Sequence, residues 1–251
     1  MAADTDHAKD VIARGERHQR RLQNALAVLS RRVVQLMGEA PLRDGQLFDL
    51  EWAVSARAQI AQFVSEEYLA EIDDIIRDYA LVAQQAEAML GQYTSLARLD
   101  EAVVRQLQSL SFRGLETLGD EFVEAVATQV YTNTLTGLPF ADAVAQIQQS
   151  VDADLGRYAQ VALNDGLMDF DRTITTNMSL EAGATSFKYF GPDDSKTRDH
   201  CEKYVGRTMT IEEIREAWSD SWSGKREGSP LVVAGGFNCR HRFRPVFQGE
   251  Q

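Results

Sequence analysis

The chain has 251 residues, of which 44% are hydrophobic and 25% are charged. This length supplies enough apolar side chains for a buried core, so its size does not require a disulfide scaffold. The formal net charge of −12 is uneven, because residues 1–187 carry 15 Lys and Arg against 28 Asp and Glu, whereas residues 188–251 carry 11 against 10. Affinity for nucleic acid depends mainly on Lys and Arg, so we predict weak or no direct nucleic-acid binding.

The sequence contains no apolar run near the roughly 18 residues that a membrane span needs, and the acidic start M-A-A-D-T-D-H lacks a hydrophobic signal core. We therefore expect a protein that is made and kept in a cytosol, without membrane contact. In that compartment the two cysteines, Cys201 and Cys239, are more often free, metal-bound or redox-active than cross-linked.

Residues 9–37 have the apolar spacing of a helix that packs along one seam. The seam residues alternate in steps of four and three: Leu22, Leu26, Leu29, Val33 and Leu36. Gly38, Pro41 and the pair Asp44-Gly45 then predict a break.

A second helix is predicted over residues 47–68 and a third over 69–90, ending at Gly91. Only the polar residues 65–67 separate the two, so one long helix is the alternative. The third helix carries a heptad-like seam, which is typical of an antiparallel bundle or coiled coil. Its members are Leu69, Ile72, Ile76, Tyr79, Ala83, Ala86 and Leu90.

Helical patterns continue over residues 96–110 and 115–131, and after a break at 136–139 Pro139 is expected in the first turn of the next helix. That helix carries Phe140, Val144 and Ile147. A last helix is predicted over residues 154–178, with its apolar side formed by Leu155, Tyr158, Ala162, Phe170 and Ile174. Residues 1–180 are thus predicted to form an elongated helical bundle or coiled coil, whose seams are either core or open to a partner.

The pattern changes after residue 180, where glycine turns and alternating aromatic residues predict a compact α+β module over residues 181–251 with a short antiparallel sheet. The complete fold class is therefore mainly α with a small α+β module. Thr210 and Glu213 fit a capping box for a helix that ends near Trp218. The other predicted elements are strands at 185–190, 231–234 and 240–247, a turn at 191–194, a short helix at 197–205 and a polar loop at 219–230.

The module contains a long composite motif: an aromatic strand, G-x-x-D-x-x-T-R-x-x-C, T-x-x-E-I, and G-G-F-N-C-R-H-x-x-x-P-V. This motif resembles the C-terminal module of the bacteriophage minor head proteins, the Mu protein F-like head morphogenesis family. In many members a histidine stands three residues before the second cysteine, where this chain has Gly236. The matching residues are Tyr189, Gly191, Asp194, Thr197, Arg198, Cys201, Gly206, Thr210, Glu213, Ile214, Gly235, Gly236, Asn238, Cys239, Arg240, His241, Pro245 and Val246.

The resemblance covers about the last quarter of the chain and implies a virion structural protein, present in the head near the portal and in the host cytoplasm during assembly. Its implied partners are the portal or the major capsid protein, which it would contact in several copies. It would assist head assembly, genome packaging or ejection, with no catalytic residue. The alternatives are a metal-dependent hydrolase or nuclease, and a cytosolic protein-interaction adaptor.

Cys201, Cys239, His241 and His200 have the ligand types of a structural zinc site. On a strand Cys239 and His241 point the same way, whereas adjacent side chains on a helix, such as His200 and Cys201, diverge by about 100°. Two other states stay open, a Cys201–Cys239 disulfide worth roughly 4 kcal/mol in the chain-entropy model and a reduced pair that packs. The zinc site, the disulfide and the packed pair would each connect distant parts of a small module and stabilise it.

Catalysis would require a metal ligand or general base among Asp193, Asp194 and Asp199 beside a histidine. Asn238 and His241 are weakly similar to a His-Asn-His nuclease motif, but a strand that contains Pro245 follows them instead of a helix.

A structural role is the alternative for the remaining motif residues. Asp194 can cap the following helix and Arg198 can hold Asp194 or a carbonyl group, while Gly235 and Gly236 form a turn next to Asn238. Arg240, Arg242 and Arg244 alternate along a predicted strand and are expected on a solvated face, bonded to local carboxylates. Trp218 and Trp222 are expected to cover the module's core, with a role as exposed partner anchors as the alternative.

Overall fold

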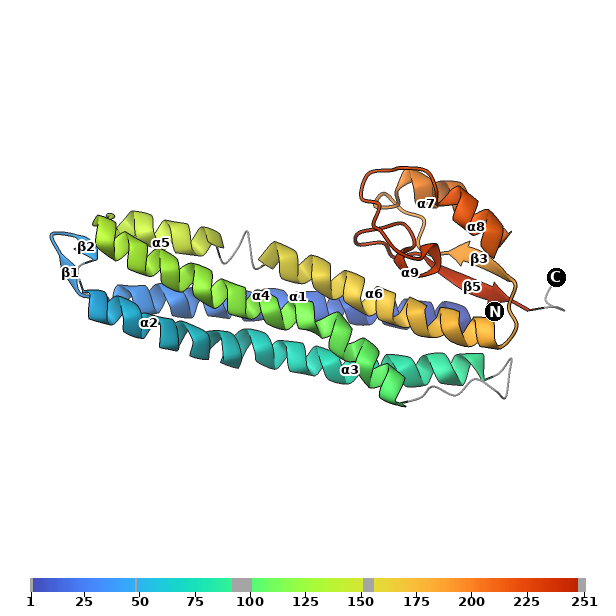
Figure 1. Cartoon of the computed structure of the whole chain (residues 1–251), viewed down its shortest axis with the longest axis horizontal. Coiled ribbons are helices and arrows are strands. Elements are labelled where there is room, and N and C mark those ends of the chain that lie inside the picture. Colours follow the sequence, from blue (N-terminus) through green and yellow to red (C-terminus); the bar gives the residue numbers. More distant parts are fainter. Residues whose placement is uncertain (1, 48, 92–100, 151–155, 248–251) are drawn as a thin grey trace. The chain divides into compact units, whose positions relative to one another are not determined.

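The structure, a computed structural model, describes residues 2–47, 49–91, 101–150 and 156–247 (Figure 1). It is mainly helical with a small three-stranded antiparallel sheet, which confirms the predicted fold class. The long elements are helices α1 (Ala2–Gly38), α2 (Leu50–Phe63), α3 (Ala70–Leu90), α4 (Glu101–Thr136), α5 (Phe140–Gln149) and α6 (Gly156–Glu181). The short elements are β1 (Leu42–Arg43), β2 (Gln46–Leu47), the π-helix η1 (Val64–Leu69), β3 (Ser186–Phe190), α7 (Asp199–Tyr204), β4 (Thr208–Thr210), α8 (Ile211–Ala217), α9 (Pro230–Val233) and β5 (Arg242–Val246).

The chain divides into two compact units, each formed by segments that are distant in sequence. The first unit comprises Met1–Glu16, Arg77–Ser111 and Asn164–Gln251, and the second comprises Arg17–Ile76 and Phe112–Leu163. The boundary predicted between residues 180 and 181 falls at the end of α6. A domain division at that point stays a prediction.

The second unit is mainly helical and contains the α1 seam predicted from sequence, whose five members are all buried. The chain stays helical from α2 through η1 into α3, so the two predicted helices form one continuous rod with a π-helical segment. Tyr68 of η1 is fully buried and donates a hydrogen bond to the carbonyl of Leu115 at 2.9 Å. Arg32 pairs with Glu66 at 2.7 Å and with Glu67 at 2.8 Å. The polar residues that seemed to separate two helices are therefore partners of α1.

Several details of the predicted helices differ from the structure. One helix, α4, replaces the two predicted before residue 131, because Phe112 and Leu115 are buried where a break was expected. Pro139 precedes α5 as its N-cap residue. Tyr158 is 52% exposed, so its assignment to an apolar seam was wrong. The predicted residues 96–100, 154 and 155 lie outside the described residues.

The α3 seam is rotated slightly from the predicted one. Ile75 and Val82 are buried, whereas Leu69 and Ile76 are only half-buried. The remaining predicted members are buried. Before α2, the break at Asp44-Gly45 is a hairpin turn that joins β1 to β2, and both turn residues have positive φ, 51° and 77°. Such a pair favours a two-residue hairpin.

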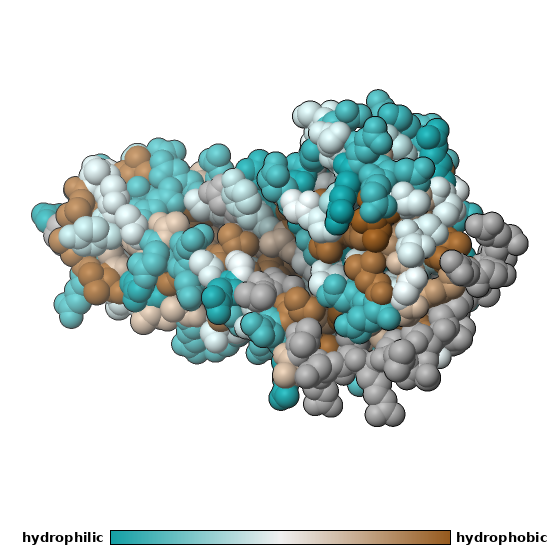
Figure 2. Space-filling view, turned by 45° about the vertical axis from the view of Figure 1, so that its right-hand side comes forward, coloured by the Kyte–Doolittle hydropathy of each residue, from teal (hydrophilic) through white to brown (hydrophobic). Residues whose placement is uncertain are grey.

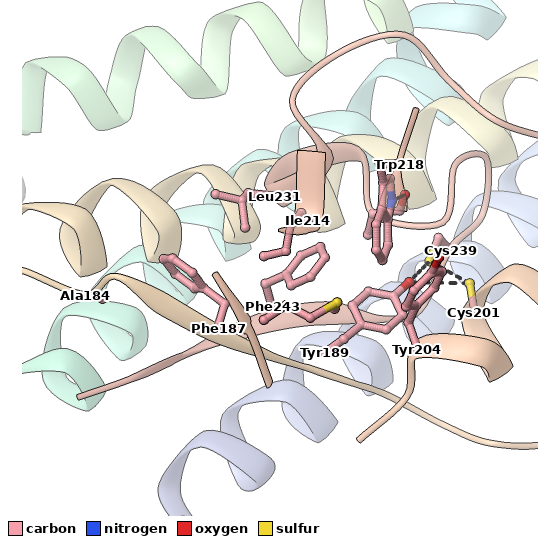
Figure 3. Close-up of a cluster of buried hydrophobic side chains, with 12 residues drawn as sticks. Ala184, Phe187, Tyr189, Cys201, Tyr204, Ile214, Trp218, Leu231, Cys239 and Phe243 are labelled. Atoms are coloured by element: carbon pink, nitrogen blue, oxygen red, sulfur yellow. Dashed lines mark hydrogen bonds between the residues drawn. The ribbon is translucent and has the colours of Figure 1, made fainter. Parts of the chain in front are cut away.

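The C-terminal module belongs to the first unit and is built on the sheet order β4-β3-β5, with β3 antiparallel to both neighbours. Phe187 and Tyr189 of β3 are fully buried, as alternation in a strand requires. They belong to one hydrophobic cluster with residues of α7, α8 and β5, part of which Figure 3 shows. The predicted capping box at Thr210 and Glu213 is present at the start of α8.

Two strand predictions in the module need correction. Residues 231–234 do not form a strand, because Pro230 begins the short helix α9 and its missing N–H costs nothing at a first helical position. The third strand is instead β4, which pairs Met209 with Phe187. The strand predicted over residues 240–247 is shorter, Arg242–Val246. None of the helices in the described part of the chain combines the length and apolar character that a membrane span requires.

Candidate functional site

Three of the predicted ligand residues meet in the interior of the module. One ligand atom from each of Cys201, Cys239 and His241 lies within 4.8 Å of the other two. The two sulfurs are 4.0 Å apart, and Cys239 Sγ is 3.8 Å from His241 Nδ1. All three residues are buried, at 1–3% exposure. Both cysteines are free, so the structure contains no disulfide between them.

The loop that carries Cys239 is shaped around its sulfur. The backbone N–H groups of Gly235 and His241 donate to Cys239 Sγ at 3.1 and 3.4 Å. A Cβ atom on Gly235 would lie 2.9 Å from Cys239 Sγ and closer still to Cys201 Sγ. Gly236 has φ 95°, a conformation that favours glycine, and a Cβ there would overlap the Gly224 carbonyl. A side chain is therefore excluded at Gly235 by the two sulfurs and at Gly236 by the backbone of Gly224.

Tyr189, in the central strand β3, points its hydroxyl toward the sulfurs of Cys201 and Cys239 (Figure 3). Its hydroxyl donates to Cys201 Sγ at 3.4 Å and lies 3.8 Å from Cys239 Sγ. Its ring stacks on His241 with a centroid distance of 5.4 Å. Burial, and then the neighbouring sulfurs, raises the pKa of Tyr189 far above its usual value. The hydroxyl therefore stays protonated at neutral pH in this arrangement.

The two thiols differ in their electrostatic surroundings. The hydrogen bond with Cys201 lowers the pKa of Cys239 well below its usual value, and His241 and the charge of Arg172 act in the same direction against burial. The same hydrogen bond, together with burial, raises the pKa of Cys201. The surroundings of Cys239 therefore favour its thiolate more than those of Cys201 do.

His200 does not join this group, so its predicted role as a ligand is not supported by the geometry. Its ring stacks on Trp222 with a centroid distance of 3.6 Å and an interplanar angle of 9°, and meets Trp218 edge-on. Burial, and then the charge of Lys203, lowers the pKa of His200 to about 4. The neighbouring Cys201 points elsewhere because consecutive side chains on α7 diverge.

The two tryptophans cover the module's core, as predicted. Trp218 is 4% exposed and Trp222 packs against the same cluster. Trp218 Nε1 donates to the Ala234 carbonyl at 2.6 Å, and Trp222 Nε1 donates to the Gly235 carbonyl at 3.1 Å. Both indoles thus fix the turn that holds the Cys239 sulfur.

Asp194 and Arg198 stabilise turns, Asp194 in a way that differs from the prediction and Arg198 as predicted. Asp194 does not cap α7, whose N-cap residue is Arg198. It accepts from the Lys196 N–H at 2.9 Å and binds both terminal nitrogens of Arg240, at 2.8 and 2.5 Å. The Arg240 hydrogen bonds, and then that from Lys196, lower the pKa of Asp194. Arg198 donates to the carbonyl of Phe237 at 2.5 Å, which is the carbonyl role expected for it.

Sequence reasoning missed Arg172 of α6, which is almost completely buried. It donates to the His241 carbonyl at 2.7 and 3.0 Å, to the Cys239 carbonyl at 2.6 Å and to the Val232 carbonyl at 3.1 Å. One guanidinium therefore holds the backbone at both ligand residues and at Val232 of α9. No motif in the sequence marks Arg172, but its neighbours Phe170 and Ile174 are buried seam residues, which places it beside the core.

A second buried ionic group also escaped prediction. Asp171 is fully buried and binds His7 at 2.8 Å and Arg242 at 2.7 Å. Arg242 also donates to the Thr175 hydroxyl at 2.9 Å. The expectation of a solvated arginine face is therefore wrong at Arg242, because its partner is a carboxylate of α6 and not a local one. Arg240, in contrast, bonds to the nearby Asp194 as expected.

Asn238 connects the same loop to α6. Its φ is 54°, and its backbone N–H donates to Asp165 at 2.7 Å. Arg226 binds Asp169 at 2.6 Å and lies 3.7 Å from Asp165. Burial raises the pKa of Asp165, and the charge of Arg226 opposes that shift. Asn238 thus serves a backbone turn that is held to α6.

Among the described residues, the group that could hold a metal ion contains no carboxylate. The three aspartates considered for hydrolysis, Asp193, Asp194 and Asp199, are exposed and lie outside it. Comparisons with protein-family models, with curated proteins and with solved structures found no match to this chain.

Proposed function

We propose that the protein is a structural component of a bacteriophage head, of the minor head or head morphogenesis type. It binds the portal or the inner face of the major capsid shell and assists head assembly, genome packaging or ejection. It acts in several copies, in the host cytoplasm during assembly and then in the virion. Its role is structural and not catalytic, and its partners are proteins, without membrane or strong nucleic-acid contact.

The observation that supports this proposal is that the residues of the composite motif form loops, turns and the buried centre of the module. Gly235, Gly236 and Asn238 form a loop around one sulfur, and Asp194 joins Arg240 across the turn. Tyr189, Cys201, Cys239 and His241 form the buried centre. The motif residues therefore maintain the fold of the module. This favours a protein whose folded surface binds a partner. A hydrolase would instead be expected to place polar reactive groups in a cleft.

A structural protein also needs a surface for its partner. On the face shown in Figure 2, hydrophobic side chains lie in small groups among hydrophilic ones. The second unit exposes two apolar pairs four residues apart on a helix, Leu50 with Val54 on α2 and Tyr131 with Leu135 on α4. Residues at this spacing share a helix face. Val54 is 65% exposed and Leu135 is 58% exposed, so these pairs are our candidates for the partner contact.

The test is crosslinking and affinity capture of tagged chain from cells infected by the phage that encodes it. Enrichment of portal or major capsid protein is expected, and it should fall for Val54→Asp. The matched control is Leu81→Asp, which changes an exposed leucine of the first unit. Capture of host cytosolic proteins without portal or capsid protein would overturn the proposal and favour an adaptor. Capture that is equal for both variants and the unchanged chain would reject the α2 surface.

A further inference from the structure

Two separations between donor atoms of the buried group are close to those of a tetrahedral metal site. With Zn–S bonds of about 2.3 Å, two thiolate ligands of one tetrahedral zinc lie about 3.8 Å apart. A thiolate and an imidazole nitrogen then lie about 3.6 Å apart. The corresponding distances here are 4.0 Å between the sulfurs and 3.8 Å from Cys239 Sγ to His241 Nδ1. The third pair, Cys201 Sγ and the His241 nitrogen, lies within 4.8 Å, so the ligands would draw together to bind one ion.

The hydroxyl of Tyr189 lies beside both sulfurs, at distances that suit a fourth donor. For a zinc–oxygen bond of about 2.0 Å, the oxygen of a tetrahedral site lies about 3.5 Å from each sulfur. Tyr189 Oη lies 3.4 Å from Cys201 Sγ and 3.8 Å from Cys239 Sγ. Tyr189 pairs with Phe243 of β5, and its backbone bonds to Gly206 and Arg207 just before β4, so its hydroxyl is fixed against the sulfurs by the fold.

The surroundings of the group suit a thiolate site and leave its imidazole short of partners. Two backbone N–H groups donate to Cys239 Sγ, and Arg172 places a positive charge beside it. Hydrogen bonds from such outer groups orient the ligands of metal centres. In the described part of the chain, the buried Nε2 of His241 has no hydrogen-bond partner, and Nδ1 has only the sulfur at 3.8 Å. An ion at Nδ1 would supply a strong partner for this ring.

We infer that Cys201, Cys239 and His241 bind one Zn²⁺ with the Tyr189 hydroxyl as the fourth donor, and that this ion holds the module together. The donor set of two sulfurs, one nitrogen and one oxygen suits zinc better than the hard ions calcium and magnesium, which prefer oxygen ligands. The site is closed and buried, as structural zinc sites are. It links α7, β3 and the loop before β5. This inference does not depend on the proposed function, since zinc content is measured on purified protein without any phage particle.

The competing states of the cysteines predict different chemistry. A disulfide would require the sulfurs to approach from 4.0 Å to a bond of about 2.05 Å. It would leave no thiol to titrate and no thiolate ligand for zinc. A packed reduced pair would leave two thiols and no metal. The zinc site alone predicts both stoichiometric metal and two titratable thiols.

The first experiment measures metal content by mass spectrometry on full-length protein purified without chelator, together with a thiol titration in denaturant. Stoichiometric zinc with two thiols per chain is expected. His241→Asn should abolish it, and the matched control His200→Gln, which changes the neighbouring histidine outside the group, should retain it. Absence of zinc from the unchanged protein overturns the inference, whatever the thiol count. Full retention of zinc by His241→Asn overturns the assigned ligand set.

A second measurement does not depend on how the variants fold. Zinc in the unchanged protein is exchanged for Co²⁺, and the absorption spectrum is recorded. A thiolate-to-cobalt charge-transfer band with the visible bands of tetrahedral cobalt is expected, and their absence overturns the site.

A third measurement tests the fourth donor. Tyr189→Phe removes only the hydroxyl and should weaken zinc affinity about tenfold or more, as loss of supporting groups does at other metal centres. Unchanged affinity would reject Tyr189 as the fourth donor.

Discussion

The substitution Arg172→Met tests how strongly α6 holds the loop that carries Cys239 and His241. The arginine side chain is 1% exposed and donates to three backbone carbonyls of the module at 2.6–3.1 Å. Methionine has a similar length but no N–H, so the carbonyls lose a charged donor in the interior. Each buried polar group left without a partner costs about 1–3 kcal/mol. The direct sum is about 3–9 kcal/mol, and because the loop can relax and admit water we expect the lower part, about 3–5 kcal/mol.

Urea unfolding followed by tryptophan fluorescence measures this loss in the free energy of unfolding, since Trp218 and Trp222 lie in the affected module. The matched control is Arg157→Met, the same change at an exposed position of the same helix. It should alter stability by no more than about 0.5 kcal/mol. Amide hydrogen exchange should rise in residues 231–243 of Arg172→Met. A loss below about 1 kcal/mol, or an equal loss in both variants, would refute the reasoning.

Two further predictions concern acid stability and the glycine turn. Burial alone would raise the pKa of Asp171. The charge of Arg242 and the interactions with His7 and Arg172 together outweigh burial, so the folded-state pKa lies below the ordinary value of 3.8. Its stabilisation is therefore complete above that value and is lost as the pH falls through the folded-state pKa. In urea midpoints measured from about pH 6 downward, the unchanged protein should lose stability more steeply below about pH 4 than Asp171→Asn, and parallel curves would contradict the ion pair. Gly235→Ala should cost about 1–3 kcal/mol, because its Cβ would collide with Cys201 Sγ. Gly114→Ala, on α4 where a Cβ would contact nothing within 4 Å, should instead stabilise by about 0.5–1 kcal/mol; urea unfolding that gave both variants the same sign would refute this prediction.

The helical part was accessible from sequence where apolar spacing reports burial directly. The α1 seam from Leu22 to Leu36 is buried at every predicted position. The capping box at Thr210 also followed from residue types, because its hydrogen bonds are local. Where two adjacent residues of a helix are both apolar, the spacing does not decide which of them faces the core. In α3, Ile75 and Ile76 are adjacent and apolar, and only the packed structure shows that Ile75 lies in the core.

Short apolar runs were the weakest point of the sequence reasoning. Residues 231–234 fit a strand or a buried helix equally well by hydrophobicity. Pro230 was the available signal, since proline favours a first helical position, and the structure begins α9 there. The strand β4 has only three residues and pairs with a strand distant in sequence, so no local pattern announces it.

The candidate site was predictable in composition but not in geometry. Cysteine and histidine types identified Cys201, Cys239 and His241, and α7 geometry explains why His200 lies elsewhere. The buried ion pairs were hidden because charged residues in a helix ordinarily face solvent. A signal exists in hindsight: Asp171 falls four residues after the buried Leu167, on the apolar seam of α6. A charge at such a position implies a buried partner.

The most direct test of the proposed role is quantitative mass spectrometry of purified particles from the phage that encodes the chain. We predict that the protein is present in the particles at several copies, in a fixed ratio to the portal protein, and that the ratio survives removal of loosely bound material. Absence of the chain from purified particles that contain portal and major capsid protein would contradict the account.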